Sequence, residues 1–258
     1  MDADVSILTL KVIGTPAIVS GATLAGRRWG PTVAGWLGGL PLASGPLTLF
    51  LAIEQGPRFA AQSADATLAG VLGVATFAVT FCQFAPRGRW PLPVFGGQLS
   101  YVGVAAIVLF VPLPAFSAFV LSLLALTVAI RLVGSPGSPE SVSGAPYWDI
   151  PARALAATVL VVGLSSLAAT LGARIVGLIA PFPIYASIMG GFTHGLYGPG
   201  ASIRLIRGVL MGLYGFTCFY FAVALLATTS VLVAFVVATG SALVVQGGSM
   251  WFIRRFGW

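Results

Sequence analysis

Four ionisable side chains stand inside or at the ends of strongly apolar stretches of this chain: Lys11, Glu54, Asp65 and His194. If these stretches cross a membrane, a charge at depth costs about 2.5–3.5 kcal/mol on insertion scales and calls for a partner. We expect a structural pair between Lys11 and either Asp65 or Glu54, or else a path for protons or cations. His194, the single histidine, is a further candidate for proton coupling, unless one backbone partner satisfies it.

Prolines and glycines interrupt two of the apolar stretches near their middles. A proline removes a hydrogen bond within a helix, so nearby carbonyl groups need other partners or a wet cavity. Paired interruptions in repeated halves of a membrane protein point to a binding site near the midplane. A plain kink that shapes packing is the alternative. The candidate substrate-binding residues, with the serines as hydroxyl ligands, are Pro41, Ser44, Gly45, Pro46, Pro183 and Ser187.

Arg204 and Arg207 follow a turn, Gly198-Pro199-Gly200, that begins a helix. Residues three apart lie on one face of a helix, and the free amides at its start favour an anion. The pair could therefore bind a lipid phosphate or an anionic substrate. The alternative is that both are topology-setting arginines whose side chains reach the membrane surface.

Enzymatic chemistry has little support in this sequence. One histidine and two separated cysteines, Cys82 and Cys218, do not form a metal-binding pattern, and phosphate-binding loops and Ser/His/Asp sets are not found. We expect no catalytic residues, no metal and no cofactor. The net charge of +7 comes from arginines scattered at helix ends, so nucleic acid is not an expected partner.

Composition indicates a membrane protein. Of the 258 residues, 58% are hydrophobic and 7% are charged, and the mean hydropathy is +1.01. Each apolar stretch is long enough to cross a hydrocarbon core of roughly 30 Å. We predict an all-α polytopic protein with nine transmembrane helices, at 5–26, 31–55, 58–85, 91–111, 113–133, 151–170, 173–197, 200–227 and 229–253.

The sequence has an internal repeat: a shift of 142 positions aligns its two halves without a gap. Most matches are glycine or proline, which constrain backbone shape, so a fold is repeated. We predict two four-helix units, 1–112 and 151–258, joined by a linking helix and cytoplasmic loop in 113–150. The linking helix inverts the second unit, which gives a 4+1+4 arrangement with interrupted helices 2 and 7. Matches include Gly35 with Gly177, Pro41 with Pro183, Gly56 with Gly198, Gly70 with Gly212 and Phe77 with Phe219.

The basic residues predict an orientation. Lys11, Arg58 and Arg174 fall on one side of the predicted helices, and ten arginines fall on the other. Because basic residues concentrate in the cytoplasm, we expect the N-terminus outside and the C-terminus inside, in the bacterial inner (plasma) membrane. The ten arginines are Arg27, Arg28, Arg87, Arg89, Arg131, Arg153, Arg204, Arg207, Arg254 and Arg255.

The second unit resembles the GlpM-like family of small four-helix bacterial inner-membrane proteins. The resemblance is carried by ARIVGLIAPFPIYASIMGGFTHGLYG at 173–198 and by IRLIRGVLMGLYGFTCFYFAVALL at 203–226, and the first unit keeps the frame at 33–56. It implies a tandem, inverted-repeat relative of that family and supports fold and location more than activity. The family's histidine falls where this chain has Thr48 and Gly190, so no role carries over to His194.

These features favour a small secondary transporter or permease with its site between interrupted helices 2 and 7. The alternative is a non-transporting envelope scaffold that binds anionic lipid through the arginine pair. Expected partners are the lipid bilayer and an anionic lipid or small-molecule substrate, and the internal repeat predicts a monomer. A sealed apolar centre would favour the scaffold, whereas transport would be favoured by a cavity reached by Ser44, Ser187, Gln98 or Glu54.

Overall fold

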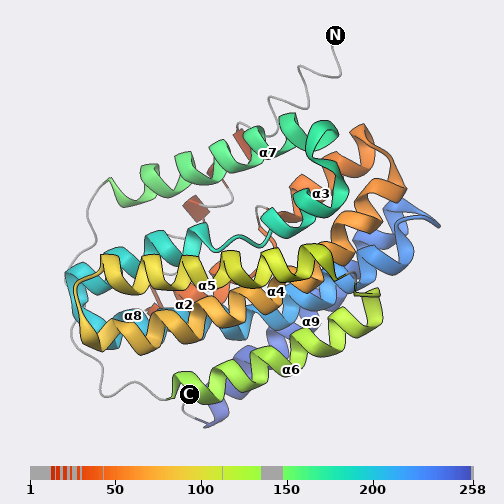
Figure 1. The fold of residues 1–258 in the computed structure, drawn as a ribbon. Coiled ribbons are helices and arrows are strands. Elements are labelled where there is room, and N and C mark those ends of the chain that lie inside the picture. Colours follow the sequence, from red (N-terminus) through yellow and green to blue (C-terminus); the bar gives the residue numbers. More distant parts are fainter. Residues whose placement is uncertain are drawn as a thin grey trace.

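The computed structural model describes residues 13–14, 16–17, 20–21, 24, 28–29, 31–42, 44–111, 113–134 and 148–256. Helices make up most of these residues (Figure 1). The helices are α2 (Pro31–Gly38), α3 (Ser44–Glu54), α4 (Pro57–Phe84), the 3-10 turn η1 (Ala85–Arg87), α5 (Pro91–Phe110), α6 (Ala115–Val133), α7 (Asp149–Ile179), α8 (Ile184–Leu226) and α9 (Val231–Phe256).

Within the described residues, five helical stretches are long and apolar enough to cross a membrane. This agrees with the predicted all-α membrane protein. The longest stretch has 57 residues and contains two of the predicted crossings. Most of the first predicted crossing, at 5–26, lies outside the described residues, so the count of nine stays a prediction. The five stretches are Pro57–Arg87, Pro91–Phe110, Ala115–Val133, Thr170–Leu226 and Val231–Ser249.

Glycines with positive φ mark the turns between successive crossings. Gly56 (φ 93°, ψ 163°) separates α3 from α4, and Gly198 (φ 78°, ψ 175°) bends α8. This backbone conformation is strained for any residue with a Cβ, so glycine fits both turns. Pro57 and Pro199 follow directly, where a proline at the start of a helix loses no hydrogen bond. The two Gly-Pro turns stand 142 positions apart.

Glycine turns in the second half fall where the predicted crossings meet. Gly172 (φ 77°, ψ 158°) bends α7 between the predicted crossings 151–170 and 173–197, and Gly198 bends α8 between 173–197 and 200–227. A single glycine turns the chain sharply while the helices on either side continue up to it. The predicted interruption of the crossing at 173–197 is a break from Ala180 to Pro183.

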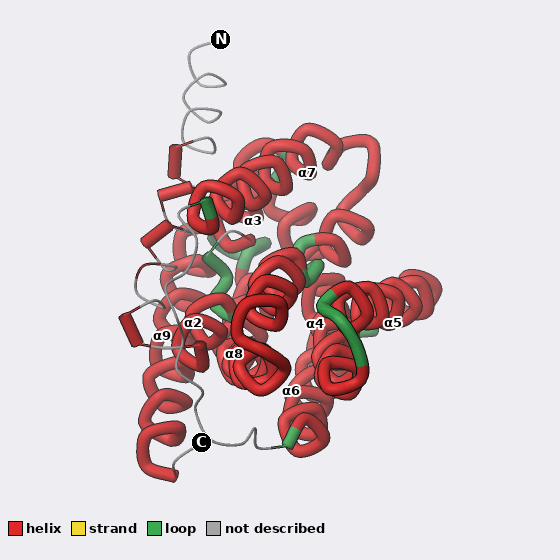
Figure 2. Tube along the Cα trace, turned by 90° about the vertical axis from the view of Figure 1, so that its left-hand side faces the viewer, coloured by secondary structure: helices red, strands yellow, loops and turns green. Residues whose placement is uncertain are grey.

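Helices α4 and α8 occupy the centre of the molecule, with α6 packed against both (Figure 2). On one side the Ser122 hydroxyl of α6 donates to the Leu68 carbonyl of α4 at 2.7 Å. On the other side the hydroxyls of Thr127 and Tyr214 lie 2.8 Å apart and join α6 to α8. The helix that links the predicted units therefore contacts the central helix of each.

Close backbone contacts recur at the same offset of 142 positions. A Cβ added to Gly35 of α2 would lie 1.9 Å from the Leu205 carbonyl oxygen of α8. A Cβ added to Gly177 of α7 would lie 2.1 Å from the Ser63 carbonyl oxygen of α4. Small residues allow such approaches between membrane helices. Each half thus inserts one helix against the central helix of the other half, and glycine makes both contacts possible.

Candidate functional site

The two predicted interruptions are real breaks with the same local geometry. In the first, between α2 and α3, the Gly45 amide donates to the Pro41 carbonyl at 2.8 Å. In the second, between α7 and α8, the Ser187 amide donates to the Pro183 carbonyl at 2.9 Å. Both bonds join residues that correspond under the offset of 142. The repeated prolines therefore produce a repeated backbone turn, as the sequence suggested.

Tyr185 joins the two breaks. It follows the second break on α8, and a Cβ added to Gly38, at the end of α2, would lie 1.8 Å from its ring. The Tyr185 hydroxyl also donates to the Ala34 carbonyl at 3.0 Å. Segments 151 residues apart in sequence therefore meet. A site between the interrupted helices stays a prediction.

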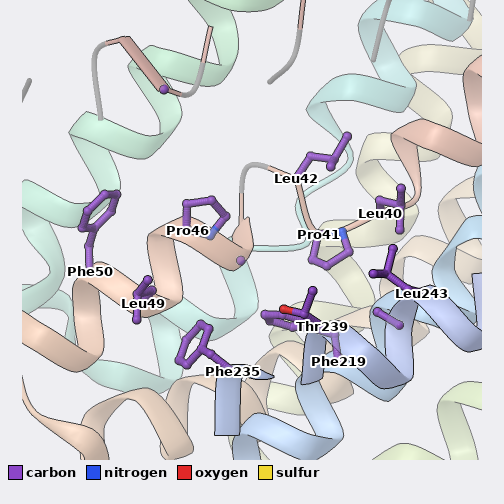
Figure 3. Close-up of a pocket in the computed structure, with 13 residues that line it drawn as sticks. Leu40, Pro41, Leu42, Pro46, Leu49, Phe50, Phe219, Phe235, Thr239 and Leu243 are labelled. Carbon is purple, nitrogen blue, oxygen red and sulfur yellow. The ribbon is translucent and has the colours of Figure 1, made fainter. Parts of the chain in front are cut away.

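A pocket of about 510 Å³ lies beside the first break, between α3, α8 and α9. Pro41 and Pro46 line it on the two sides of the break and face Phe235, Thr239 and Leu243 of α9 (Figure 3). Its volume falls within the range of small-molecule sites, about 300–1,000 Å³. Its lining is apolar except for the Thr239 side chain: Gly14, Leu40, Pro41, Leu42, Gly45, Pro46, Leu49, Phe50, Phe219, Phe235, Thr239, Ala242 and Leu243.

The predicted substrate-binding residues divide between this pocket and the helix packing. Pro41, Gly45 and Pro46 line the pocket, whereas Ser44, Pro183 and Ser187 are not among its lining residues. Ser44 is buried, and its carbonyl oxygen accepts a hydrogen bond from the Thr48 hydroxyl at 2.9 Å. Neither predicted serine thus supplies a hydroxyl ligand to the pocket.

A buried polar pair lies at the second break. The Gln98 amide of α5 donates to the Ser187 hydroxyl of α8. The Gln98 side-chain oxygen is buried and has no hydrogen-bond partner among the described residues. This oxygen is an acceptor available to a donor group from a ligand.

Three of the four candidate coupling groups lie among the described residues, each on a different helix. Glu54 is exposed at the end of α3, and Lys11 lies outside the described residues. Asp65 is half-buried on α4, and its Oδ1 has no hydrogen-bond partner among the described residues. His194 is 9% exposed, with Nε2 2.8 Å from the Ala85 carbonyl oxygen. The Ala85 carbonyl is thus the backbone partner that was the alternative to proton coupling for His194.

The two arginines differ in their surroundings. Arg207 is 6% exposed, and its guanidinium donates to the Gly134 carbonyl, just beyond the end of α6, at 2.8 Å. A cation at a helix C-terminus also complements the helix dipole. Arg204 is half-buried, and a Cβ added to Gly200 would lie 3.8 Å from its Nη1. The structure thus gives Arg207 a role at a helix end in addition to the predicted anion site.

Sequence reasoning missed the far wall of the pocket. Phe219, Phe235 and Thr239 come from α8 and α9, and in sequence they read as ordinary residues of apolar helices. A signal was present, because Phe219 corresponds to Phe77 under the repeat. Nothing in the sequence places α9 against the first break.

Among the described residues, no three His, Cys, Asp or Glu side chains come together as metal ligands.

Comparisons of the chain with protein-family models, curated proteins and solved structures found no match. The fold and the apolar helices define the class, an all-α membrane protein. The GlpM-like resemblance stays a prediction from the quoted segments.

Proposed function

We propose that this chain is a small secondary transporter or permease of the bacterial inner membrane, with its substrate site at the break between α2 and α3. The single observation that carries the proposal is the pocket of about 510 Å³ beside that break, although Ser44, Ser187, Gln98 and Glu54 are not among its lining residues. Broken helices in repeated halves are the usual setting of a transporter site. Because the lining is apolar, the part of the substrate bound there is apolar, and an amphipathic solute is the best match.

The proposal includes an inverted repeat of two four-helix units, with the N-terminus outside and the C-terminus in the cytoplasm. The support is the recurrence, at one offset, of the Gly-Pro turns, the breaks and the glycine contacts. It also includes a GlpM-like origin and a monomer that supplies both halves of the site.

Uptake into proteoliposomes tests the transport function. Octanoate and phenylethylamine serve as anionic and cationic amphipathic probes, with mass spectrometry of the vesicle contents as the readout. Thr239→Trp should fill the pocket and lower uptake about tenfold or more, because a bulky ring would take the space of the substrate. Val236→Trp is the matched control, since Val236 lies on the same helix and is not among the residues that line the pocket. Uptake no faster than in protein-free vesicles, or equal uptake by Thr239→Trp, would contradict the proposal.

A second candidate function is a non-transporting envelope scaffold that binds anionic lipid. The apolar pocket lining favours it, because an acyl chain needs no polar partner. Arg204 and Arg207 would then hold the headgroup. Native mass spectrometry of the protein purified with phosphatidylglycerol separates the two functions. Retained lipid that is lost in Thr239→Trp, together with no uptake of either probe, would favour the scaffold.

A further inference from the structure

Every residue that lines the pocket has a counterpart in the other half of the chain. Pro41 and Gly45 correspond to Pro183 and Ser187, at the second break. The wall of the pocket opposite the first break is formed by α8 and α9, and its counterpart at the second break is formed by α4 and α5. Under the offset of 142, Phe77 corresponds to Phe219, Gly97 to Thr239, Gln98 to Gly240 and Tyr101 to Leu243.

The counterpart position is filled by side chains. The Phe77 ring lies so close to Gly97 that a Cβ added there would be 2.7 Å away. Tyr101 packs edge-on against Phe182, with ring centroids 5.1 Å apart, and Gln98 hydrogen-bonds Ser187 across the position. The second break is therefore closed by its own walls.

At the first break space remains, because the pocket of about 510 Å³ is lined there by Gly45, Phe219 and Leu243. A Cβ added to Gly45 would be 3.4 Å from the Phe219 ring. Two breaks with one backbone geometry thus differ in how the opposite helix pair packs against them. In proteins with inverted repeats, the two units can adopt different packings. One side of the membrane protein is then accessible while the other side is closed.

We propose that the break between α7 and α8 is a second binding position for the same substrate, closed in this structure, and that the two positions open alternately. This inference rests on the proposed transport function. At the second position the buried Gln98 oxygen and the Ser187 hydroxyl are available to an N–H or O–H group. The substrate class is accordingly an amphipathic molecule with an apolar body and a hydrogen-bond donor.

The alternation can be tested without the natural substrate. In a background with Cys82→Ala and Cys218→Ala, Ser187→Cys reports on the second position and Gly45→Cys on the first. Each thiol is labelled in proteoliposomes with methyl methanethiosulfonate, a small uncharged reagent, and the rate is followed by mass spectrometry. Gly45 lines the pocket and Ser187 does not, so the rate at Ser187→Cys should be the slower of the two.

Exchanging residues between the halves should then shift the two rates in opposite directions. Thr239→Gly with Leu243→Tyr gives the first break the closing residues of the second, Gly97 and Tyr101. It should slow labelling of Gly45→Cys and speed that of Ser187→Cys about tenfold, within the range of coupled sites in proteins. Conversely, Tyr101→Leu should speed labelling at Ser187→Cys and slow it at Gly45→Cys. Val236→Tyr, on α9 but outside the pocket lining, should leave both rates unchanged.

The inference is overturned if folded variants change the rate at the altered position alone. It is also overturned if neither exchange moves either rate. Folding is checked by a single symmetric peak in size-exclusion chromatography. Normal uptake of phenylethylamine, the probe that carries N–H donors, with uncoupled rates would reject alternation and leave transport standing. Coupled labelling rates without uptake of any probe would reject transport, whereas the alternate opening of the two positions would stand.

Discussion

Several hydroxyl, amide and indole groups among the described residues find partners on neighbouring helices. The Tyr220 hydroxyl lies 3.1 Å from the Thr48 hydroxyl and joins α8 to α3. The indole N–H of Trp36 donates to the Ser249 hydroxyl at 2.9 Å and joins α2 to α9. In a bilayer such bonds contribute to helix association because no water competes for the groups. At the residue scale, polar side chains act as links between crossings, and glycines set how near the crossings come.

Gly35→Ala should destabilise the protein by about 1–3 kcal/mol, the cost of overpacking a close contact. The added methyl group would lie 1.9 Å from the Leu205 carbonyl, which belongs to backbone and cannot rotate away. Gly177→Ala should behave alike. Gly240→Ala is the matched control, because nothing lies within 4 Å there and alanine favours a helix. Thermal unfolding in detergent measures all three, and equal melting temperatures for Gly35→Ala and Gly240→Ala would contradict the contact.

Asp65 should be paired with Lys11. Its Oδ1 lacks a hydrogen-bond partner among the described residues, and a carboxylate at that depth is costly without a cation. A double-mutant cycle with Asp65→Asn and Lys11→Met should give a coupling energy of about 0.5–3 kcal/mol. The same cycle with Glu54→Gln in place of Asp65→Asn tests the alternative pair. Coupling to Glu54 and none to Asp65 would reverse the assignment.

At the scale of elements, helix C-termini in this protein are satisfied by arginines from other helices. Arg207 of α8 donates to the Gly134 carbonyl beyond α6, and Arg174 of α7 donates to the Val108 carbonyl near the end of α5 at 2.6 Å. The last carbonyls of a helix lack partners within it, and a cation there also interacts well with the dipole. Two basic residues that count toward orientation in sequence therefore also fasten helix ends.

Arg207→Met should lower stability by about 1.5–3 kcal/mol, because a hydrogen bond to a charged group is lost and the Gly134 carbonyl is left without it. Arg131→Met is the matched control, since Arg131 is exposed near the end of the same helix, α6. Melting temperatures of both variants in one detergent provide the comparison. If Arg131→Met lowers the melting temperature as much as Arg207→Met does, the loss of positive charge is responsible and not the hydrogen bond to the Gly134 carbonyl.

At the scale of the whole molecule, the offset of 142 positions recurs in turns, breaks and close contacts, with α6 between the two halves. If the halves are inverted, the pocket beside the first break lies toward one membrane face and its filled counterpart toward the other. Orientation then decides which face the pocket serves. From the distribution of basic residues we expect the pocket to lie toward the outside.

Reporter fusions test that orientation. Alkaline phosphatase should be active when fused at the N-terminus with an export signal, and green fluorescent protein should be fluorescent at the C-terminus. The physical reason is the excess of arginines on the side assigned to the cytoplasm. A cytoplasmic N-terminus would contradict both the orientation and the odd number of crossings.

Local backbone features of this protein were determined by its sequence alone. Proline and glycine restrict φ and ψ wherever they occur, so the breaks at Pro41 and Pro183 and the turns at Gly56 and Gly198 could be predicted. Hydrophobic composition likewise predicts the membrane class. These properties depend on residues near one another in the chain.

The pocket was decided by tertiary structure. It depends on where α9 lies against α3, and apolar helices carry little sequence information about which neighbour they choose. The repeat predicts two equivalent positions, yet the packing leaves one hollow and fills the other with Phe77 and Tyr101. Similar sequences can adopt two packings of similar energy, so the state of each break is a property of the assembled bundle.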